Sequence, residues 1–207
     1  MAPRETRLDM QYFTVATGQA DPGGNQAVTV PLNRRVLVPL DPERKRRLRK
    51  HLIQSLRSMR VMKRPVESAS PLRPEPGGFL GTVARAACGL CKGWCCKGGG
   101  EHGYLDERVM ARVRQARPEL DARSVIRLYT ERVPASGYAG SCIFHAECGC
   151  TLDRSLRSDV CNSYFCSGLG NLVKTGQAPA GALIIATQDG ETRILPVITP
   201  QSMMRSG

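Results

Sequence analysis

The sequence has no long apolar run and few aromatic residues. No stretch approaches the roughly 20 apolar residues that span a bilayer, and aromatic residues make up only 5% of the 207. The first 24 residues, MAPRETRLDMQYFTVATGQADPGG, also lack the apolar segment of a secretory signal. These absences exclude a membrane-spanning helix. We therefore expect a cytoplasmic protein without a membrane partner, in which thiols stay reduced.

The common catalytic patterns are missing as well. The sequence contains no Walker phosphate loop, no dinucleotide-binding glycine pattern after a strand and no Ser/His/Asp spacing. Glycine (21 residues) and proline (14 residues) are frequent, which indicates many turns and irregular segments. Part of the stability must then come from something other than apolar burial. Whether the protein is an enzyme stays open.

What the sequence does contain is a dense group of cysteines. All nine lie between residues 88 and 166, and chance scatter would confine them so closely only about twice in ten thousand sequences. The neighbouring glycines allow tight backbone turns, and Lys92 and Lys97 offset thiolate charge. The first group reads Cys88-Gly-Leu-Cys91-Lys-Gly-Trp-Cys95-Cys96, and the second contains Cys142, Cys148, Cys150, Cys161 and Cys166.

This pattern predicts a metal centre. Four thiolates suit zinc or an iron–sulfur cluster, [4Fe–4S] if the metal is iron, equally well. The two-residue gap between the first two cysteines lets both sulfurs reach one ion from a tight turn. The predicted metal ligands are Cys88, Cys91, Cys95, Cys96, Cys148, Cys150, Cys161 and Cys166. Cys142 is interpreted as a small buried hydrophobe. Redox-active thiols and a disulfide scaffold are the alternatives, although an odd number of cysteines leaves one thiol over.

At these cysteines the chain resembles the YkgJ-type cysteine-cluster family, also described as a zinc- or iron-chelating domain. The family pattern begins CxxCxxCC and continues, after a helical segment, with GCxIYxxRPxxCRxxxC. The matching residues are Cys88, Cys91, Cys95, Cys96, Gly149-Cys150, Arg157, Cys161 and Phe165-Cys166. The chain departs from the pattern in two spacings and lacks the Pro after the arginine. The resemblance covers about residues 85–170 and implies metal or iron–sulfur binding. A flagellin lysine methylase carries a related cysteine domain, so the resemblance also makes a protein-modifying activity conceivable.

Six polar residues near the cysteines are further candidates for a role at the site: Glu101, His102, His145, Asp153, Arg154 and Arg157. The histidines are alternative ligands of a mixed thiolate–imidazole site. The arginines would hydrogen-bond to thiolates or to a substrate anion, and the acids are acid–base candidates by proximity only. A solvated surface position is the competing interpretation for these side chains. Trp94 either shields the site from water or anchors the core.

The whole chain is expected to form an α+β protein, a small irregular metal-centred domain with short helices and a C-terminal β-hairpin. We predict four segments: an irregular segment 1–40, a basic amphipathic helix 41–64, a Pro/Gly-rich linker 65–79 and a cysteine-cluster domain 80–200. Asp41-Pro42 is typical of a helix start, and a second helix is predicted after Asp121. Asp189-Gly190, between two β-rich runs, predicts the hairpin turn.

The basic helix carries most of the net charge of +12. Between Asp41 and Arg64 there are ten Lys or Arg and two acids, a net of +8, beside an apolar stripe that includes Leu48, Leu52 and Leu56. Such a helix can contact phosphates, but it has no aromatic residues for base stacking, and a protein partner fits as well. The functional hypotheses are therefore a metal-binding module, an iron–sulfur enzyme with redox or protein-modifying activity, and a zinc-scaffolded nucleic-acid-binding protein.

Overall fold

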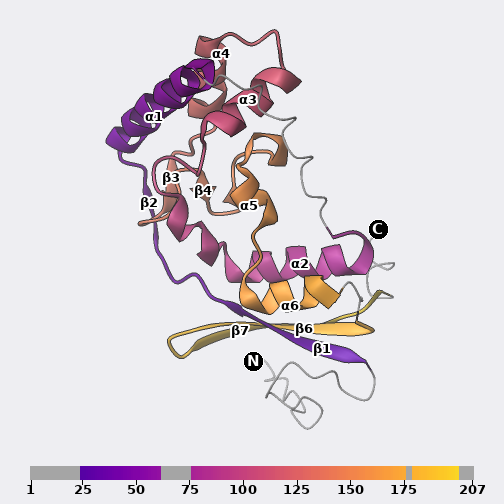
Figure 1. The fold of residues 1–207 in the computed structure, drawn as a ribbon. Coiled ribbons are helices and arrows are strands. Elements are labelled where there is room, and N and C mark those ends of the chain that lie inside the picture. Colours follow the sequence, from indigo (N-terminus) through magenta and orange to yellow (C-terminus); the bar gives the residue numbers. More distant parts are fainter. Residues whose placement is uncertain (1–23, 62–75, 176–178, 201–207) are drawn as a thin grey trace. The chain divides into compact units, whose positions relative to one another are not determined.

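The computed structural model describes residues 24–61, 76–175 and 179–200 and confirms a mixture of helices and strands (Figure 1). Its contacts divide the chain into two compact units. The sheet unit contains described residues 24–32, 76–90, 167–175 and 179–200, and the thiol unit contains residues 33–61 and 91–166. The domain expected over residues 80–200 is thus shared between both units, because the N-terminal strand pairs with a strand near the C-terminus.

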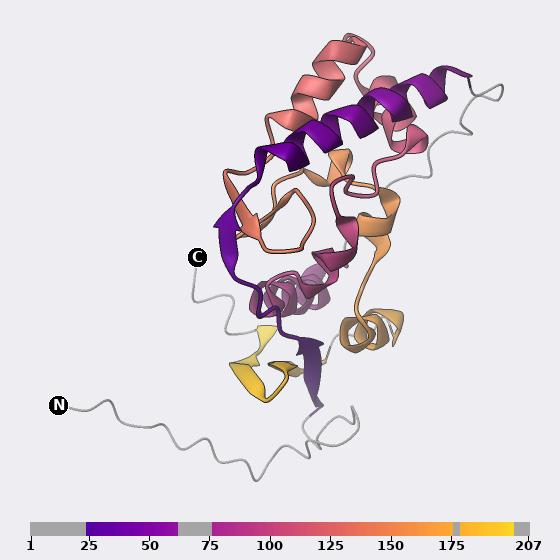
Figure 2. The ribbon, with the colours of Figure 1, turned by 90° about the vertical axis from the view of Figure 1, so that its left-hand side faces the viewer.

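The sheet unit is a three-stranded sheet with the order β1-β6-β7. Helices α2 and α6 cover one of its faces (Figures 1 and 2). β1 runs parallel to β6, and β6 runs antiparallel to β7 across Asp189 and Gly190, which both have positive φ. The elements are β1 (Asn25–Pro31), β6 (Gly181–Gln188), β7 (Glu191–Ile198), α2 (Gly78–Cys91) and α6 (Ser167–Thr175). Buried Val28, Val30 and Ile184 form the sheet side of this core.

The thiol unit consists of helices, short ladders and 3₁₀ turns around a second core. The helices are α1 (Pro42–Val61), α3 (Glu107–Ala116), α4 (Ala122–Thr130) and α5 (Asp159–Ser163), and the 3₁₀ turns are η2 (Trp94–Gly99) and η3 (Arg154–Leu156). The ladders pair β2 (Leu37–Pro39) with β3 (Ser136–Tyr138), and β4 (His145–Ala146) with β5 (Gly149–Cys150). Tyr129 and Phe144, with rings 6.3 Å apart, are the largest fully buried side chains of this core.

Helix α1 follows directly from its sequence. The Asp41 carboxylate accepts a hydrogen bond from the Glu43 N–H at 2.8 Å, which caps the first turn. The apolar stripe packs against α3 and α4, with Leu48, Leu52 and Leu56 at most 4% exposed. Predicted helix residues 62–64 and linker residues 65–75 lie outside the described residues, as do residues 1–23. No helix within the described ranges is long and apolar enough to cross a membrane.

The next two helices of the thiol unit have the caps that their sequences indicate. Asp106 and Asp121 accept hydrogen bonds from the N–H groups of Val109 and Ser124, at the starts of α3 and α4. Thus the helix predicted after Asp121 is present as α4. The start of α3 fixes the chain just after the first cysteine group.

Candidate metal centre

The first pair of cysteines lies on a helix. Cys88 and Cys91 occupy the last turn of α2, whereas the sequence predicted a tight turn for them. The apolar run before them allows the helix to continue through both residues, which then share one helix face. Cys88 is exposed and belongs to the sheet unit, and Cys91 is buried and begins the thiol unit.

A buried asparagine fixes the end of this helix. The backbone N–H of Asn33 donates to the Cys91 carbonyl at 2.9 Å, and its side-chain amide donates to the Lys92 carbonyl at 2.9 Å. These two bonds satisfy carbonyls that have no partner at a helix C-terminus. Asn33 is only 4% exposed. Sequence alone does not identify this residue, because one asparagine far from the cysteines carries no recognisable pattern.

After Cys91 the chain turns sharply and enters η2. Lys92 and Gly93 both have positive φ, 53° and 65°. This turn brings the Trp94 N–H to the Cys91 Sγ at 3.4 Å. Lys97 Nζ lies 3.6 Å from the centre of the Trp94 ring, a cation–π contact at the surface of the loop. Trp94 is therefore half-buried beside Cys91, covered on its outer side by a cation.

The second cysteine segment is hydrogen-bonded to the first. The Cys142 N–H donates to the Cys96 carbonyl at 3.0 Å, and the Ile143 N–H donates to the Gly100 carbonyl at 2.8 Å. The two backbones approach so closely that Gly99 has no room for a side chain. A Cβ on Gly99 would lie 2.7 Å from the Cys142 Cβ and 2.8 Å from its Sγ. The two cysteine segments, although far apart in the sequence, are therefore in direct contact.

Seven thiols form a group, here called the thiol group, in which the charge of one cysteine raises the pKa of another: Cys91, Cys95, Cys96, Cys142, Cys150, Cys161 and Cys166. Burial is the main cause of the raised pKa values of Cys91, Cys142 (to about 12) and Cys161, and the neighbouring thiolates add to it. The thiol group therefore unites sulfurs from both cysteine segments. At neutral pH these three buried thiols hold their protons.

The adjacent pair Cys95 and Cys96 differs in its protonation. A hydrogen bond from the Cys96 thiol lowers the pKa of Cys95 to about 7. The same bond, followed by burial, raises the pKa of Cys96. Cys95 is exposed and Cys96 is half-buried. Of the two, Cys95 is the one that ionises near neutral pH, and Cys96 is the thiol that stabilises its thiolate.

The structure divides the predicted ligands. Six of the eight belong to the thiol group as defined above, and Cys88 lies in the last turn of α2 within the sheet unit. Cys148 is exposed in the turn between β4 and β5, and its charge raises none of the pKa values given above. The seventh member is Cys142, which the sequence analysis assigned to packing; its side chain is indeed 9% exposed and part of the apolar core. All nine cysteines lie within the described residues, and none forms a disulfide.

The segment between Cys161 and Cys166 opens, as a shared site would require. Helix α5 ends at Ser163, and Tyr164 has an extended backbone. The two cysteines are therefore not held 140° apart on one helix. The Cys161 N–H donates to the Ser158 hydroxyl at 3.2 Å, which caps α5 and fixes the position of this cysteine.

The polar candidates are engaged by neighbouring groups to different extents, and the buried Nε2 of His145 has no hydrogen-bond partner. His145 is 1% exposed, and its Nδ1 lies 2.8 Å from the Ser141 Oγ. Burial, assisted by Arg35, lowers the pKa of His145, so its ring is neutral at pH 7. Arg157 Nε donates to the Leu152 carbonyl at 2.8 Å, so this arginine bonds to the backbone.

Two further candidates, Glu101 and His102, contact side chains of α1. Glu101 bonds to Arg44 at 3.2 Å and to Arg47 at 3.4 Å, which ties the first cysteine loop to α1. The His102 ring lies 5.5 Å from the ring of His51 on α1, tilted by 46°. Both side chains are engaged by residues of α1, and these contacts give acid–base and ligand roles for this pair no support.

The chemistry of the thiols favours a metal site, whereas their arrangement in the structure does not provide one. Seven clustered thiols fit a soft or borderline metal. Within the described residues, however, no group of three or more His, Cys, Asp or Glu side chains is arranged so that it could hold a metal ion. The thiols thus influence one another's pKa without forming a preformed coordination sphere. Comparisons with known proteins identified no matching family model, no matching curated protein and no matching solved structure.

Proposed function

We propose that the thiol unit is a metal-binding module, which holds zinc or an iron–sulfur cluster through members of the thiol group. The observation that carries this proposal is the backbone contact between the two cysteine segments, the hydrogen bond from Cys142 to Cys96. This bond joins the backbones of the two segments, and thiols of both segments influence one another's pKa, which supports a shared site. Membership in the YkgJ-type family and a cytoplasmic location, where such thiols stay reduced, belong to the same proposal.

The ligands we propose are Cys91, Cys95, Cys150 and Cys161. Cys95 already ionises near neutral pH, whereas Cys91 and Cys161, whose pKa values are raised, would have to lose their protons to hold a metal. Metal affinity therefore rises with pH. Because the sulfurs are not preassembled, binding draws the loop after α2 and the segment around α5 together, and part of the binding energy becomes folding energy.

The metal supplies either structural cross-linking, if it is zinc, or electron transfer, if it is an iron–sulfur cluster. Trp94 and Lys97 cover the Cys91 side of the loop, and the cation of Lys97 offsets thiolate charge. An enzyme with redox or protein-modifying activity would use the same cluster, and iron with sulfide in the protein would favour that alternative.

Metal analysis of matched variants tests the proposal. The full chain is purified without oxygen, and zinc, iron and sulfide are measured; a brown protein indicates the cluster and a colourless one indicates zinc. We expect Cys91→Ser and Cys161→Ser each to lose most of the bound metal. Cys148→Ser, an exposed cysteine outside the thiol group, should retain it. Equal metal content in all three variants, or a wild-type chain that takes up neither metal, would overturn the assignment.

A further inference from the structure

The outer face of α1 carries a dense row of cations. Seven of its Lys and Arg side chains are exposed: Lys45, Arg46, Arg47, Arg49, Lys50, Arg57 and Arg60. Arg46 pairs with Glu43, and Arg47 pairs with Glu101. The other five have no acidic partner among the described residues. Repulsion between these cations is not relieved within the described part of the chain, so the face is suited to a polyanion.

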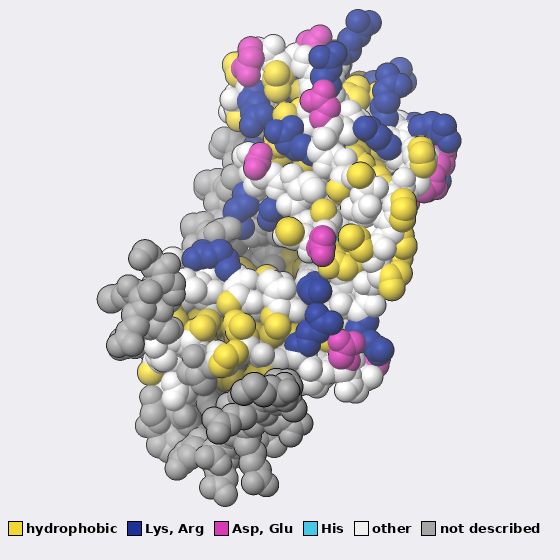
Figure 3. Space-filling view, turned by 180° about the vertical axis from the view of Figure 1, so that it is seen from behind, with side chains coloured by type: hydrophobic (Ala, Val, Ile, Leu, Met, Phe, Trp, Pro, Cys, Tyr) yellow, Lys and Arg dark blue, Asp and Glu magenta, His cyan; other side chains and the backbone are white. Residues whose placement is uncertain are grey.

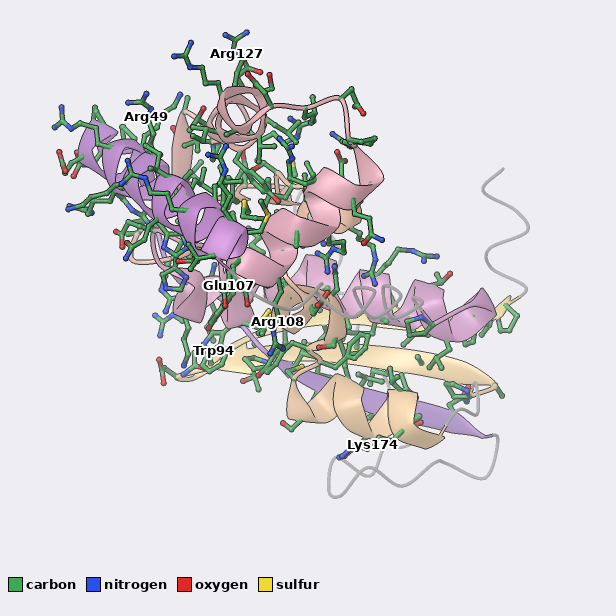
Figure 4. The ribbon with its side chains drawn as sticks, turned by 45° about the horizontal axis from the view of Figure 1, so that its top comes forward. Arg49, Trp94, Glu107, Arg108, Arg127 and Lys174 are labelled. Atoms are coloured by element: carbon green, nitrogen blue, oxygen red, sulfur yellow. The ribbon has the colours of Figure 1, made fainter. Side chains whose placement is uncertain are left out.

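The cations are concentrated in one unit. The described thiol unit has 21 Lys or Arg against 11 Asp or Glu, whereas the described sheet unit has 3 against 2. In Figure 3 the Lys and Arg side chains gather over the end formed by α1, α3 and α4. Figure 4 shows Arg49 on α1 and Arg127 on α4 extending away from the ribbon of these packed helices. The basic surface therefore extends from α1 onto α4.

The packing of α1 decides between classes of polyanion. A helix that binds a membrane surface inserts its apolar face between lipids. Here Leu48, Leu52 and Leu56 are already buried against the core of the thiol unit, so only the charged face is available. Single-stranded nucleic acid requires aromatic side chains for base stacking, and α1 contains no Phe, Tyr or Trp.

Duplex DNA is the polyanion that suits the exposed charged face of α1. Four of the unpaired cations, Arg49, Lys50, Arg57 and Arg60, fall within a sector of about 100° of the helix and span about 17 Å along its axis. A helix with its side chains is roughly 10–12 Å wide, which matches the major groove of B-DNA at about 12 Å, and phosphates follow each edge of that groove. The major groove of duplex RNA is too narrow to admit such a helix.

We propose that the exposed face of α1, extended by Arg127 on α4, binds duplex DNA through its phosphates. The contacts are to the backbone, so binding tolerates different base sequences and weakens steeply with salt. The substitutions that test this surface leave every cysteine in place. The comparison of the test variant with its control therefore holds whichever metal the thiol unit binds.

The experiment measures fluorescence anisotropy of a labelled 20-base-pair duplex with the full chain between 50 and 200 mM salt. The test variant is Arg49→Gln with Arg57→Gln. The control is Lys174→Gln with Arg193→Gln, which removes the same charge from the sheet unit. We expect the test variant to bind at least about tenfold more weakly at 50 mM salt, with a log–log salt slope shallower by about 1.8, or 0.9 per lost phosphate contact. The control should bind within about twofold of wild type.

Three results would overturn the proposal: no binding by wild type at 50 mM salt, equal losses in test and control, or tighter binding to duplex RNA, to phosphatidylserine vesicles or to polyglutamate than to the duplex. All the substituted side chains are exposed. Circular dichroism shows whether the variants fold, and Lys50→Gln with Arg60→Gln is a second test pair with the same expected loss.

Discussion

Different interactions stabilise the sheet unit and the thiol unit internally. In the sheet unit, β1 and β6 are paired over seven residues, and this sheet has one face under two helices. In the thiol unit the ladders have three and two residue pairs, and eight of the nine cysteines are found there. One unit is thus defined by backbone pairing. The other depends on side chains, loop turns and, on our proposal, a metal.

Of the changes considered, removal of the metal should produce the largest difference in stability between the two units. If the centre is structural zinc, it contributes on the order of 10 kcal/mol of folding free energy. A chelator should then abolish the protection of thiol-unit amides against hydrogen exchange, and β6 amides should stay protected. Hydrogen exchange with mass spectrometry measures both at once. Simultaneous loss of protection in both units, or none in either, contradicts this contrast.

Gly168→Ala should give the largest effect in the sheet unit. A Cβ at Gly168 would lie 1.8 Å from the Thr29 carbonyl oxygen, so α6 would have to move away from β1. We expect a loss of about 3 kcal/mol or more of unfolding free energy, measured by urea denaturation. Gly89→Ala on α2, where a Cβ meets nothing within 4 Å, is the control and should stabilise the chain by up to about 1 kcal/mol. A destabilised control would mean that the contact with Thr29 is not the cause.

Gly99→Ala is the matching substitution in the thiol unit. The new Cβ would collide with Cys142, a loss of about 1–3 kcal/mol by overpacking. It should also lower metal content, since it separates the two cysteine segments. Urea denaturation and elemental analysis on the same preparation measure both effects. Unchanged metal content would show that the contact between Gly99 and Cys142 does not position the ligands.

Glu101→Gln should give the smallest effect, and one that depends on pH. Burial raises the pKa of Glu101, but Arg44 and Arg47 outweigh it and hold the pKa below the usual value of 4.5. The ion pair therefore stabilises the fold above that value, and the contribution is lost as pH falls through the lowered pKa. Because the side chain is 38% exposed, we expect a loss of less than about 1 kcal/mol at pH 7. Denaturation at pH 7 and at pH 3 should show a smaller difference between variant and wild type at the lower pH.

Local features of the fold were readable from the sequence, and contacts between distant segments were not. Asp41 and Asp121 start their helices because capping depends on residues within one turn. The pairing of β1 with β6 and the role of Asn33 depend on residues brought together only by folding. At the site, the cysteines were identified from their density. The exclusion of Cys148 and the inclusion of Cys142 needed burial and proximity, which spacing does not contain.

The parallel register that matches Asn25 with Gly181 has a consequence for the order of folding. During synthesis β1 emerges first, and its partner strand emerges only after the whole thiol unit has left the ribosome. Until then β6, the central strand of the sheet, is absent, and the backbone edge of β1 stays unpaired. Sequence separation of this kind slows folding, and it makes the sheet unit, although it begins first, the last part of the chain to be completed.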